Sequence, residues 1–199
     1  MSVEPARDRR ARRHEATKAE ILDAAWNIVR AEGLAALSLR DVAKRVGMQA
    51  PSLYQYFDSK HAIYDAMFAQ GNRELRARYA RLRKSDDPVR DLRVAAKLFV
   101  EFCAEDPARY QLLFQRTIPG FEPSAESYAL AVEILELGRA RLAAAGFTEQ
   151  RALDLWTGML AGLAAQQTAN EPGGTRWARL VDDVVDMYVN HMTSTRRRK

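Results

Sequence analysis

Apolar residues along this chain recur at spacings of three and four, the pattern of helices with one buried face. The pattern is clear in Ile21, Ala25 and Ile28 near the start, and again between Val181 and Met192 near the end. No run of four to eight residues alternates apolar and polar side chains between turn signals, so the sequence predicts no strands. We therefore expect an all-α protein of about nine helices.

Capping residues mark where several of these helices begin. Ser38 and Ser59 are typical N-caps, and Asp87 and Asp106 each precede a proline that suits the first turn of a helix. The polar run at 85–87 is the best candidate for a boundary between two parts of the chain. We expect the helix before this boundary to pack on both parts.

Residues 38–57 have the pattern of a helix-turn-helix. Val42 and Val46 lie on one apolar face of a first helix, Gly47 supplies the turn, and Pro51 begins a second, short helix. In such a unit the first helix supports the second, which enters the major groove of DNA. The segment therefore predicts DNA binding.

The same segment resembles the DNA-binding signature of the tetracycline-repressor (TetR) family. The resemblance is carried by LSLRDVA at 37–43, VGM at 46–48 and PSLYQYF at 51–57, followed by Lys60. It implies a helix-turn-helix domain of three helices at 17–65, and a larger helical domain at 66–199 that binds an effector and dimerises. The function it implies is that of a transcriptional regulator, most commonly a repressor, acting as a homodimer on an inverted-repeat operator in double-stranded DNA.

By this resemblance, positions in and around the second helix are assigned to DNA. Gln55 presents its amide to a base, in a geometry that suits adenine, and Arg40 reaches a guanine edge or a nearby phosphate. The phenol groups of Tyr54 and Tyr56 and the ammonium of Lys60 are assigned to phosphates. The alternative for the tyrosines is a packed aromatic cluster. The predicted DNA-binding residues are Arg40, Ala50, Pro51, Ser52, Tyr54, Gln55, Tyr56 and Lys60.

Two positions depart from the family pattern. Gln49 stands where Ser or Thr is common, which leaves the second helix without its usual cap, and His61 stands where Glu is frequent and inherits no role. Residues 1–16 are rich in arginine and have two interpretations. They form either a disordered, solvated arm or an arm in the minor groove, and we expect the disordered arm.

The charge distribution favours a polyanionic partner at one end. Residues 1–84 carry a net charge of +7, residues 85–195 carry −6, and the last four residues are all basic. A basic end on an acidic body is typical of nucleic-acid binding, although a solvated basic surface gives the same numbers. The charge also fits an alternative function, a non-specific architectural DNA-binding protein. A third possibility is a helical scaffold that no longer binds DNA.

The remaining composition argues against other classes of protein. Cys103 is the only cysteine, which excludes a disulfide framework and a cysteine-based zinc finger, and it is expected to be buried. The three histidines have no partner at metal-ligand spacing, and catalytic and phosphate-binding motifs are missing, so we expect no metal, no cofactor and no enzyme. The longest uncharged stretch, 155–170, is too short and polar to span a membrane, and we expect a cytoplasmic protein.

Large apolar and aromatic side chains gather in the acidic half. They could form an ordinary helical core or, as the resemblance implies, line a cavity for a small apolar or amphiphilic effector. The predicted effector pocket comprises Phe99, Phe102, Tyr110, Phe114, Tyr128, Trp156, Met159 and Gln166. The segment 114–121 is predicted to be a flexible connection that gates entry to this pocket.

A dimer interface is predicted from the last two helices. Gly158 and Gly162 lie one turn apart, which permits the close approach of another helix. Together with the apolar face between Val181 and Met192, they predict a two-fold interface of four helices. In the family that the sequence resembles, the last two helices pair in this way.

Overall fold

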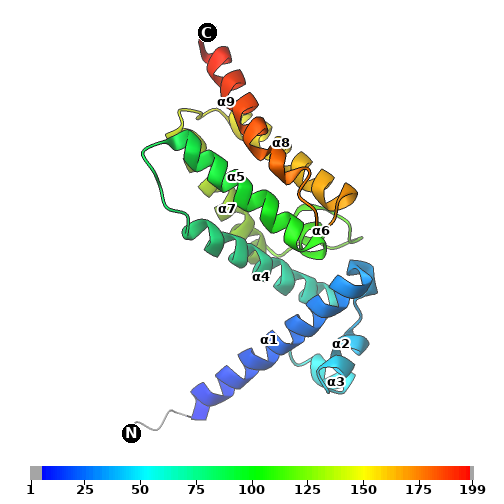
Figure 1. Cartoon of the computed structure of the whole chain (residues 1–199). Coiled ribbons are helices and arrows are strands. Elements are labelled where there is room, and N and C mark those ends of the chain that lie inside the picture. The colour runs from blue at the N-terminus through cyan, green and yellow to red at the C-terminus, as the bar shows by residue number, and fades with distance from the viewer. Residues whose placement is uncertain (1–5, 198–199) are drawn as a thin grey trace.

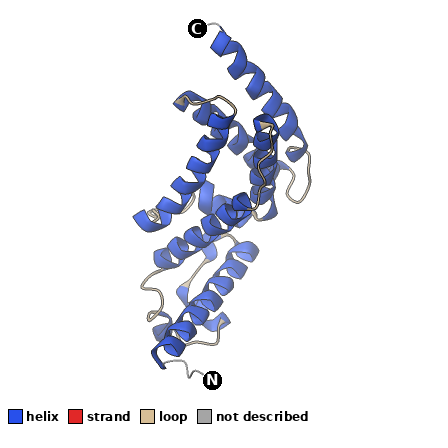
Figure 2. Ribbon diagram, turned by 90° about the vertical axis from the view of Figure 1, so that its left-hand side faces the viewer, coloured by secondary structure: helices blue, strands red, loops and turns tan. Residues whose placement is uncertain are grey.

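A computed structural model describes residues 6–197, which form nine α-helices and two short 3-10 helices (Figure 1). The helices are α1 (Ala6–Glu32), α2 (Leu39–Arg45), α3 (Ala50–Leu53), α4 (Lys60–Ala80), α5 (Pro88–Glu105), α6 (Pro107–Phe114), α7 (Ala125–Ala144), α8 (Gln150–Asn170) and α9 (Val181–Arg197), with η1 (Leu34–Ala36) and η2 (Ala178–Leu180) between them. No strand occurs in this described part of the chain (Figure 2). The prediction of an all-α fold is confirmed.

The helices form a small unit at one end and a larger body above it. Helices α1, α2 and α3 lie together at the bottom of Figure 1, and α9 ends at the opposite extreme of the molecule. Helix α4 connects the two parts, because Ile63 and Met67 belong to the core of the small unit while Phe68 and Leu75 belong to a core of the body. The expected packing of this helix on both sides is thus observed.

The body has two hydrophobic clusters. The first joins α5, α7, α8 and α9 around residues such as Trp156 and Tyr188, whose rings meet edge to face at 5.2 Å. The second joins α4, α5, α6 and α8 around Phe102 and Cys103, both fully buried. Burial raises the pKa of the Cys103 thiol, so the sulfur stays protonated and unreactive.

Four of the expected N-caps are present, each accepting a backbone N–H bond. Ser38 accepts from Asp41, and Ser59 accepts from Ala62, both at 3.1 Å. Asp87 accepts from Val89 at 2.9 Å and from Arg90 at 3.1 Å, and Asp106 accepts from Arg109 at 3.0 Å. Because each cap satisfies donors that the first turn leaves unpaired, the helix starts are determined locally by the sequence.

The expectation of a disordered arm over 1–16 is wrong for most of that segment. Residues 6–16 form the first turns of α1, which runs without interruption to Glu32. The reason is that this segment combines strong helix formers, Ala, Arg and Glu, with no proline or glycine after Pro5. The rest of the predicted arm, residues 1–5, lies outside the described residues.

Candidate nucleic-acid interface

The interface is built on α2, which is anchored at both ends. Ser38 caps its start, while Val42 and Ala43 on its inner face are fully buried. After the helix, Gly47 adopts φ of +69°, a conformation that side-chain-bearing residues rarely adopt, and the N–H of Met48 bonds to the carbonyl of Ala43 at 2.8 Å. The turn therefore leaves α2 in a fixed direction and positions the helix that follows.

Helix α3 is short and held by apolar side chains. Leu53 is fully buried and Phe57, just beyond the helix, is 7% exposed. The helix begins after Gln49, whose side chain makes no cap bond, as expected from its departure from the family pattern. Pro51 occupies the first turn, where its missing N–H costs no hydrogen bond.

The opposite side of α3 faces solvent. Pro51, Tyr54 and Gln55 are exposed, and Tyr54 is 52% exposed despite its aromatic ring. Gln55 lies just after the helix, in a turn that continues it through a 3.3 Å bond from its N–H to the carbonyl of Ser52. Arg40 on α2 is also exposed, whereas Ala50, Ser52, Tyr56 and Lys60 are half-buried. All eight predicted DNA-binding residues thus retain some accessible surface.

Tyr56 has a partner that the sequence did not indicate. Its ring stacks on the His14 imidazole, with ring centroids 4.7 Å apart and ring planes 21° from parallel. His14 lies in the N-terminal part of α1, the part expected to be disordered. The contact attaches the N-terminal part of α1 to the end of the helix-turn-helix and holds the Tyr56 ring in place.

Lys60 is engaged within the protein. Its ammonium donates a 3.1 Å bond to the carbonyl of Ala35 in η1 and lies 5.5 Å from the centre of the Tyr64 ring. The Tyr64 hydroxyl donates to the neighbouring carbonyl of Leu34, and burial raises the pKa of Tyr64 to about 12. The first turn of α4 and η1 therefore form one polar joint beside the helix-turn-helix.

This segment matches a described family. Residues 21–67 match the family of bacterial regulatory proteins named tetR, and the matched segment contains all of α2 and α3. This part of the chain is a tetR-family DNA-binding domain. Members of this family are DNA-binding transcriptional regulators, so the alternative of a non-specific architectural protein is not favoured.

Similarity to known proteins extends beyond this domain. The chain is 32% identical over 100 residues to the transcriptional activator FasR of Mycolicibacterium smegmatis, which is 49% of this chain and 45% of that protein. The chain thus spans about half the length of this curated relative. Among solved structures, the tetR-family regulator PfmR of Thermus thermophilus is 22% identical, with a TM-score of 0.66, over 85% of this chain and 97% of that one. The regulator FadR of Bacillus subtilis, in complex with stearoyl-CoA, is 16% identical, with a TM-score of 0.62, over 86% and 97%.

The eight predicted effector-pocket residues fall into different parts of the structure. Phe102 and Tyr110 are buried in the cluster between α4 and α6, and Trp156 is buried in the other cluster, with Met159 packed against it. Phe99 contacts both clusters and meets the half-exposed Phe114 edge to face at 5.2 Å.

The last two, Tyr128 and Gln166, are exposed to solvent. Their positions on α7 and α8 face away from both hydrophobic clusters, so they belong to neither cluster. Phe99, Phe102, Tyr110 and Phe114 are the members that the fold brings together.

The small unit of α1, α2 and α3, with the start of α4, is called the DNA-binding unit below. The segment after Phe114, predicted to gate the effector pocket, lies against this unit. Phe121 packs 5.6 Å from the Tyr64 ring and 5.9 Å from the His61 ring. Ser127, at the start of α7, donates to the carboxylate of Asp65 on α4 at 2.8 Å. His61 thus acquires a packing role, in a contact between two segments that no local sequence pattern connects.

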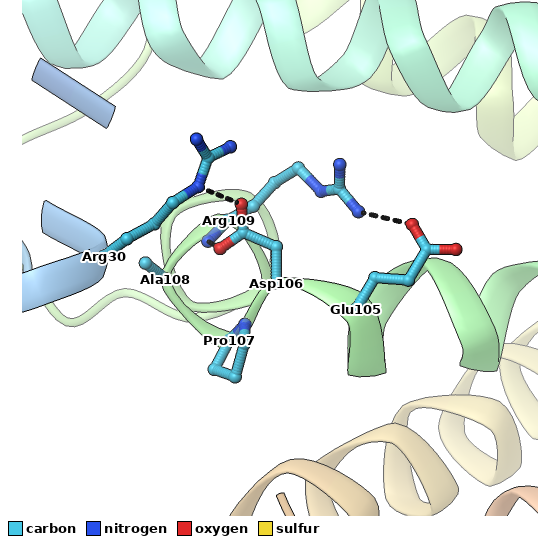
Figure 3. Close-up of a pocket in the computed structure, with 6 residues that line it drawn as sticks. All are labelled: Arg30, Glu105, Asp106, Pro107, Ala108 and Arg109. Carbon is cyan, nitrogen blue, oxygen red and sulfur yellow. Dashed lines mark hydrogen bonds and ion pairs between the residues drawn. The ribbon is translucent and has the colours of Figure 1, made fainter. Parts of the chain in front are cut away.

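A polar joint connects α1 with α6 (Figure 3). Arg30, near the end of α1, donates to Asp106 at 2.8 Å, and the same carboxylate caps α6. Arg109, only 5% exposed, donates to Glu74 on α4 at 2.8 Å and to the carbonyl of Phe102 at 2.7 Å, with its guanidinium 3.6 Å from the centre of the Phe102 ring. A cavity of about 490 Å³ borders this joint. The sequence indicated the cap, but not that Asp106 contacts the DNA-binding unit.

Two further findings concern the described residues. They contain no group of three or more His, Cys, Asp or Glu side chains placed to hold a metal ion. None of their helices has the length and apolar character needed to cross a membrane.

Proposed function

We propose that the protein is a sequence-specific transcriptional repressor that binds an inverted-repeat operator as a homodimer and releases it when a small apolar or amphiphilic effector binds. The observation that carries this proposal is the exposed surface of α3, with Tyr54 and Gln55 facing solvent from a backbone that Leu53 and Phe57 anchor. Such an arrangement presents polar groups to the major groove on a rigid support.

Reading of bases is assigned to Gln55 and Arg40. A glutamine amide forms two hydrogen bonds with adenine, and an arginine forms two with guanine. Tyr54, Tyr56 and Lys60 are assigned to phosphates on either side. For Lys60 this contact requires that the bond to the carbonyl of Ala35 be exchanged for one to a phosphate oxygen.

Dimerisation is assigned to α8 and α9. A Cβ atom added at Gly158 or Gly162 would meet no other residue within 4 Å, so this side of α8 is open to another helix. On α9, Met187 is 66% exposed although it is apolar. Burial of this surface against a second copy would remove apolar area from water and relate two α3 helices by a two-fold axis.

Effector binding is assigned to the body. Transmission of its effect to the DNA-binding unit is assigned to the contact between α6 and α1. Because Asp106 begins α6 and also accepts from Arg30, a displacement of α6 would act directly on α1. The solved complex of FadR from Bacillus subtilis with stearoyl-CoA supports an amphiphilic ligand in a protein of this fold. The effect of such a ligand on DNA affinity is limited to its differential affinity for the two conformations, typically about 1–3 kcal/mol.

The test begins with selection of bound sequences from random DNA by the purified protein. We expect an inverted repeat whose half-sites lie about one helical turn apart or somewhat more. With that operator, Gln55→Ala should cost about 1–3 kcal/mol and relax preference at one position of each half-site. Gln111→Ala, an exposed glutamine on α6, is the matched control and should leave binding unchanged.

Three results would contradict the proposal. The first is unchanged preference at every position in the Gln55→Ala protein. The second is a monomer that binds a single half-site tightly. The third concerns direction: an operator placed within a reporter promoter should lower transcription, and a rise would show activation, the direction named for the relative FasR.

A further inference from the structure

A cavity of about 330 Å³ lies at the edge of the body, between the end of α4, the start of α5 and the second half of α7. The loop 81–87, at the left of Figure 1, runs past it from α4 to α5. The cavity is separate from the aromatic residues predicted to hold an effector, because none of those eight lines it. Its size falls at the lower end of the range of small-molecule sites, about 300–1,000 Å³.

The wall of this cavity is mainly apolar. Leu82 from the loop, Val94 from α5 and Leu137 from α7 contribute aliphatic surface, and Ala140 and Ala144 add small side chains. Val94 is 42% exposed, whereas Ala95 and Ala96, which follow it on the same helix, are buried. An apolar chain lying here would remove this surface from water.

Positive charge is concentrated around the same cavity. Arg83, Lys84 and Arg141 line it, and none of the three makes an ion pair with a carboxylate in the described part of the chain. Arg141 donates instead to the carbonyls of Leu137 at 3.1 Å and Tyr79 at 3.4 Å. Unpaired cations beside an apolar wall attract an anion that carries an apolar group.

The one carboxylate in the lining is already occupied. Asp91 accepts a 2.8 Å bond from the Ser85 hydroxyl and 3.1 Å bonds from the Ser85 N–H. These hydrogen bonds, with a smaller contribution from the charge of Arg141, lower the pKa of Asp91. Its charge therefore holds the loop in place, and three cations face the cavity against a single anion.

We propose that this cavity binds one anionic amphiphile, with its apolar chain against Val94 and Leu137 and its oxyanion head, a carboxylate or a phosphate, at Arg83, Lys84 and Arg141. This inference names a site and a ligand chemistry for the effector of the proposed function, and rests on that function only for the consequence at the operator. The occupation of the cavity itself stands on the lining described above.

The experiment measures binding of decanoate, at concentrations below those that form micelles, by isothermal titration calorimetry. We expect saturable binding at one site, comparable binding of decyl phosphate, and binding of uncharged 1-decanol that is weaker by about tenfold. Val94→Trp fills the cavity and should weaken decanoate binding by about tenfold or more. The double variant Arg83→Ala, Lys84→Ala should weaken decanoate binding while leaving 1-decanol binding within about twofold.

The chain offers two matched controls. Val132→Trp places the same large side chain at a valine that is 40% exposed elsewhere on the surface, and Arg73→Ala removes an exposed cation of α4 that does not line the cavity. Both should bind decanoate like the native protein, and circular dichroism verifies that every variant is folded. Native affinity in Val94→Trp, equal affinity for 1-decanol and decanoate, or no saturable binding by the native protein would each overturn the site.

The same samples separate this inference from the proposed function. Native protein that binds decanoate at this cavity but selects no DNA sequence would contradict the repressor and leave the site standing. Native protein that selects an operator but does not bind decanoate or decyl phosphate would contradict the site and leave the regulator standing. If both hold, decanoate should lower operator affinity in the native protein and not in Val94→Trp.

Discussion

Helices α3 and α7 expose most of their surface for different reasons. Of the four residues of α3, only Leu53 is buried, and of the twenty residues of α7, only Ser127 and Leu142 are. The exposed side of α3 carries the polar groups that we propose hydrogen-bond to DNA, and it lies in the segment that matches the tetR family. The exposed side of α7 is instead largely aliphatic, including Val132 and Leu135.

The difference shows that exposure alone does not identify a functional surface. The few buried side chains of α3 fix its orientation because they enter a closed core shared with α1, α2 and α4. Helix α7 is held mainly along α4, through contacts that leave room for the cavity beside Leu137 and Ala140. A rigid, shallow surface suits a large ligand such as DNA, whereas a loosely covered helix suits a small one.

The largest expected effect is on the free energy of unfolding, in a comparison of three leucine-to-alanine variants. Leu53→Ala and Leu142→Ala each remove a fully buried side chain and should lower the free energy of unfolding by about 2–5 kcal/mol. Leu135→Ala, at a position 39% exposed, should change it by well under about 1.5 kcal/mol. Urea unfolding followed by circular dichroism measures all three.

These variants also separate the two helices by function. Because Leu53 positions α3, its variant should bind operator DNA more weakly under conditions where it remains folded, whereas folded Leu142→Ala should bind normally. Equal operator affinity in the two folded variants would show that Leu53 does not hold the interface.

The second prediction concerns caps. Ser38→Ala and Asp106→Ala each remove a capping oxygen, which typically costs about 1 kcal/mol. Ser38 acts within the DNA-binding unit, but Asp106 also accepts from Arg30 across the joint. The effects of Asp106→Ala and Arg30→Ala on unfolding should therefore be non-additive, by about 0.5 kcal/mol or more, while those of Ser38→Ala and Arg30→Ala should add. Additive effects in both double variants would show that Arg30 and Asp106 do not stabilise each other across the contact between α1 and α6.

The third prediction tests the edge of the DNA surface. Lys60→Ala should weaken binding to all sequences and lower by about one the slope of log affinity against log salt, because one phosphate contact is lost. Arg179→Ala, at an exposed side chain of η2 in the body, is the control and should leave the slope unchanged. An unaltered slope in Lys60→Ala would show that the Lys60 ammonium does not contact a phosphate.

The smallest expected effect is a dependence on pH in the body. Hydrogen bonds from Arg78 lower the pKa of Glu105 below its ordinary 4.5, so the pair stabilises the fold at neutral pH and this contribution is lost as pH falls through the folded-state pKa. Glu105 is half-exposed, and solvent keeps the effect small. Glu105→Gln should lose less stability than the native protein between pH 7 and pH 3.5 in urea unfolding, while Glu122→Gln should behave like the native protein.

The parts of the fold that the sequence predicted depend on neighbours in the chain. Ser38, Gly47 and Leu53 each act within a turn or two, so the helix-turn-helix and its exposed face could be predicted residue by residue. Ser124 caps α7 in the same way, through a 3.2 Å bond from the N–H of Ser127, but the start of this helix was not recognised. The signal was present, although no apolar stripe followed it.

The parts that escaped prediction depend on distant partners. His14 meets Tyr56 from 42 positions away, and Arg30 meets Asp106 from 76 positions away. Neither contact has a local signature. The aromatic residues of the body share a composition, but which of them meet is decided by helix rotation, and Tyr128 faces solvent for this reason.

The buried thiol of Cys103 makes the protein a convenient object for distance measurement. Its only native cysteine is shielded from solvent and protonated, so maleimide and methanethiosulfonate labels should not react with it. Cys103 therefore does not need to be replaced before labelling. A single exposed cysteine, introduced as Gln111→Cys or Arg116→Cys, would then carry the only spin label or fluorophore in each copy. In a dimer, two such labels would report the separation of the copies in solution, with and without DNA, on a native core.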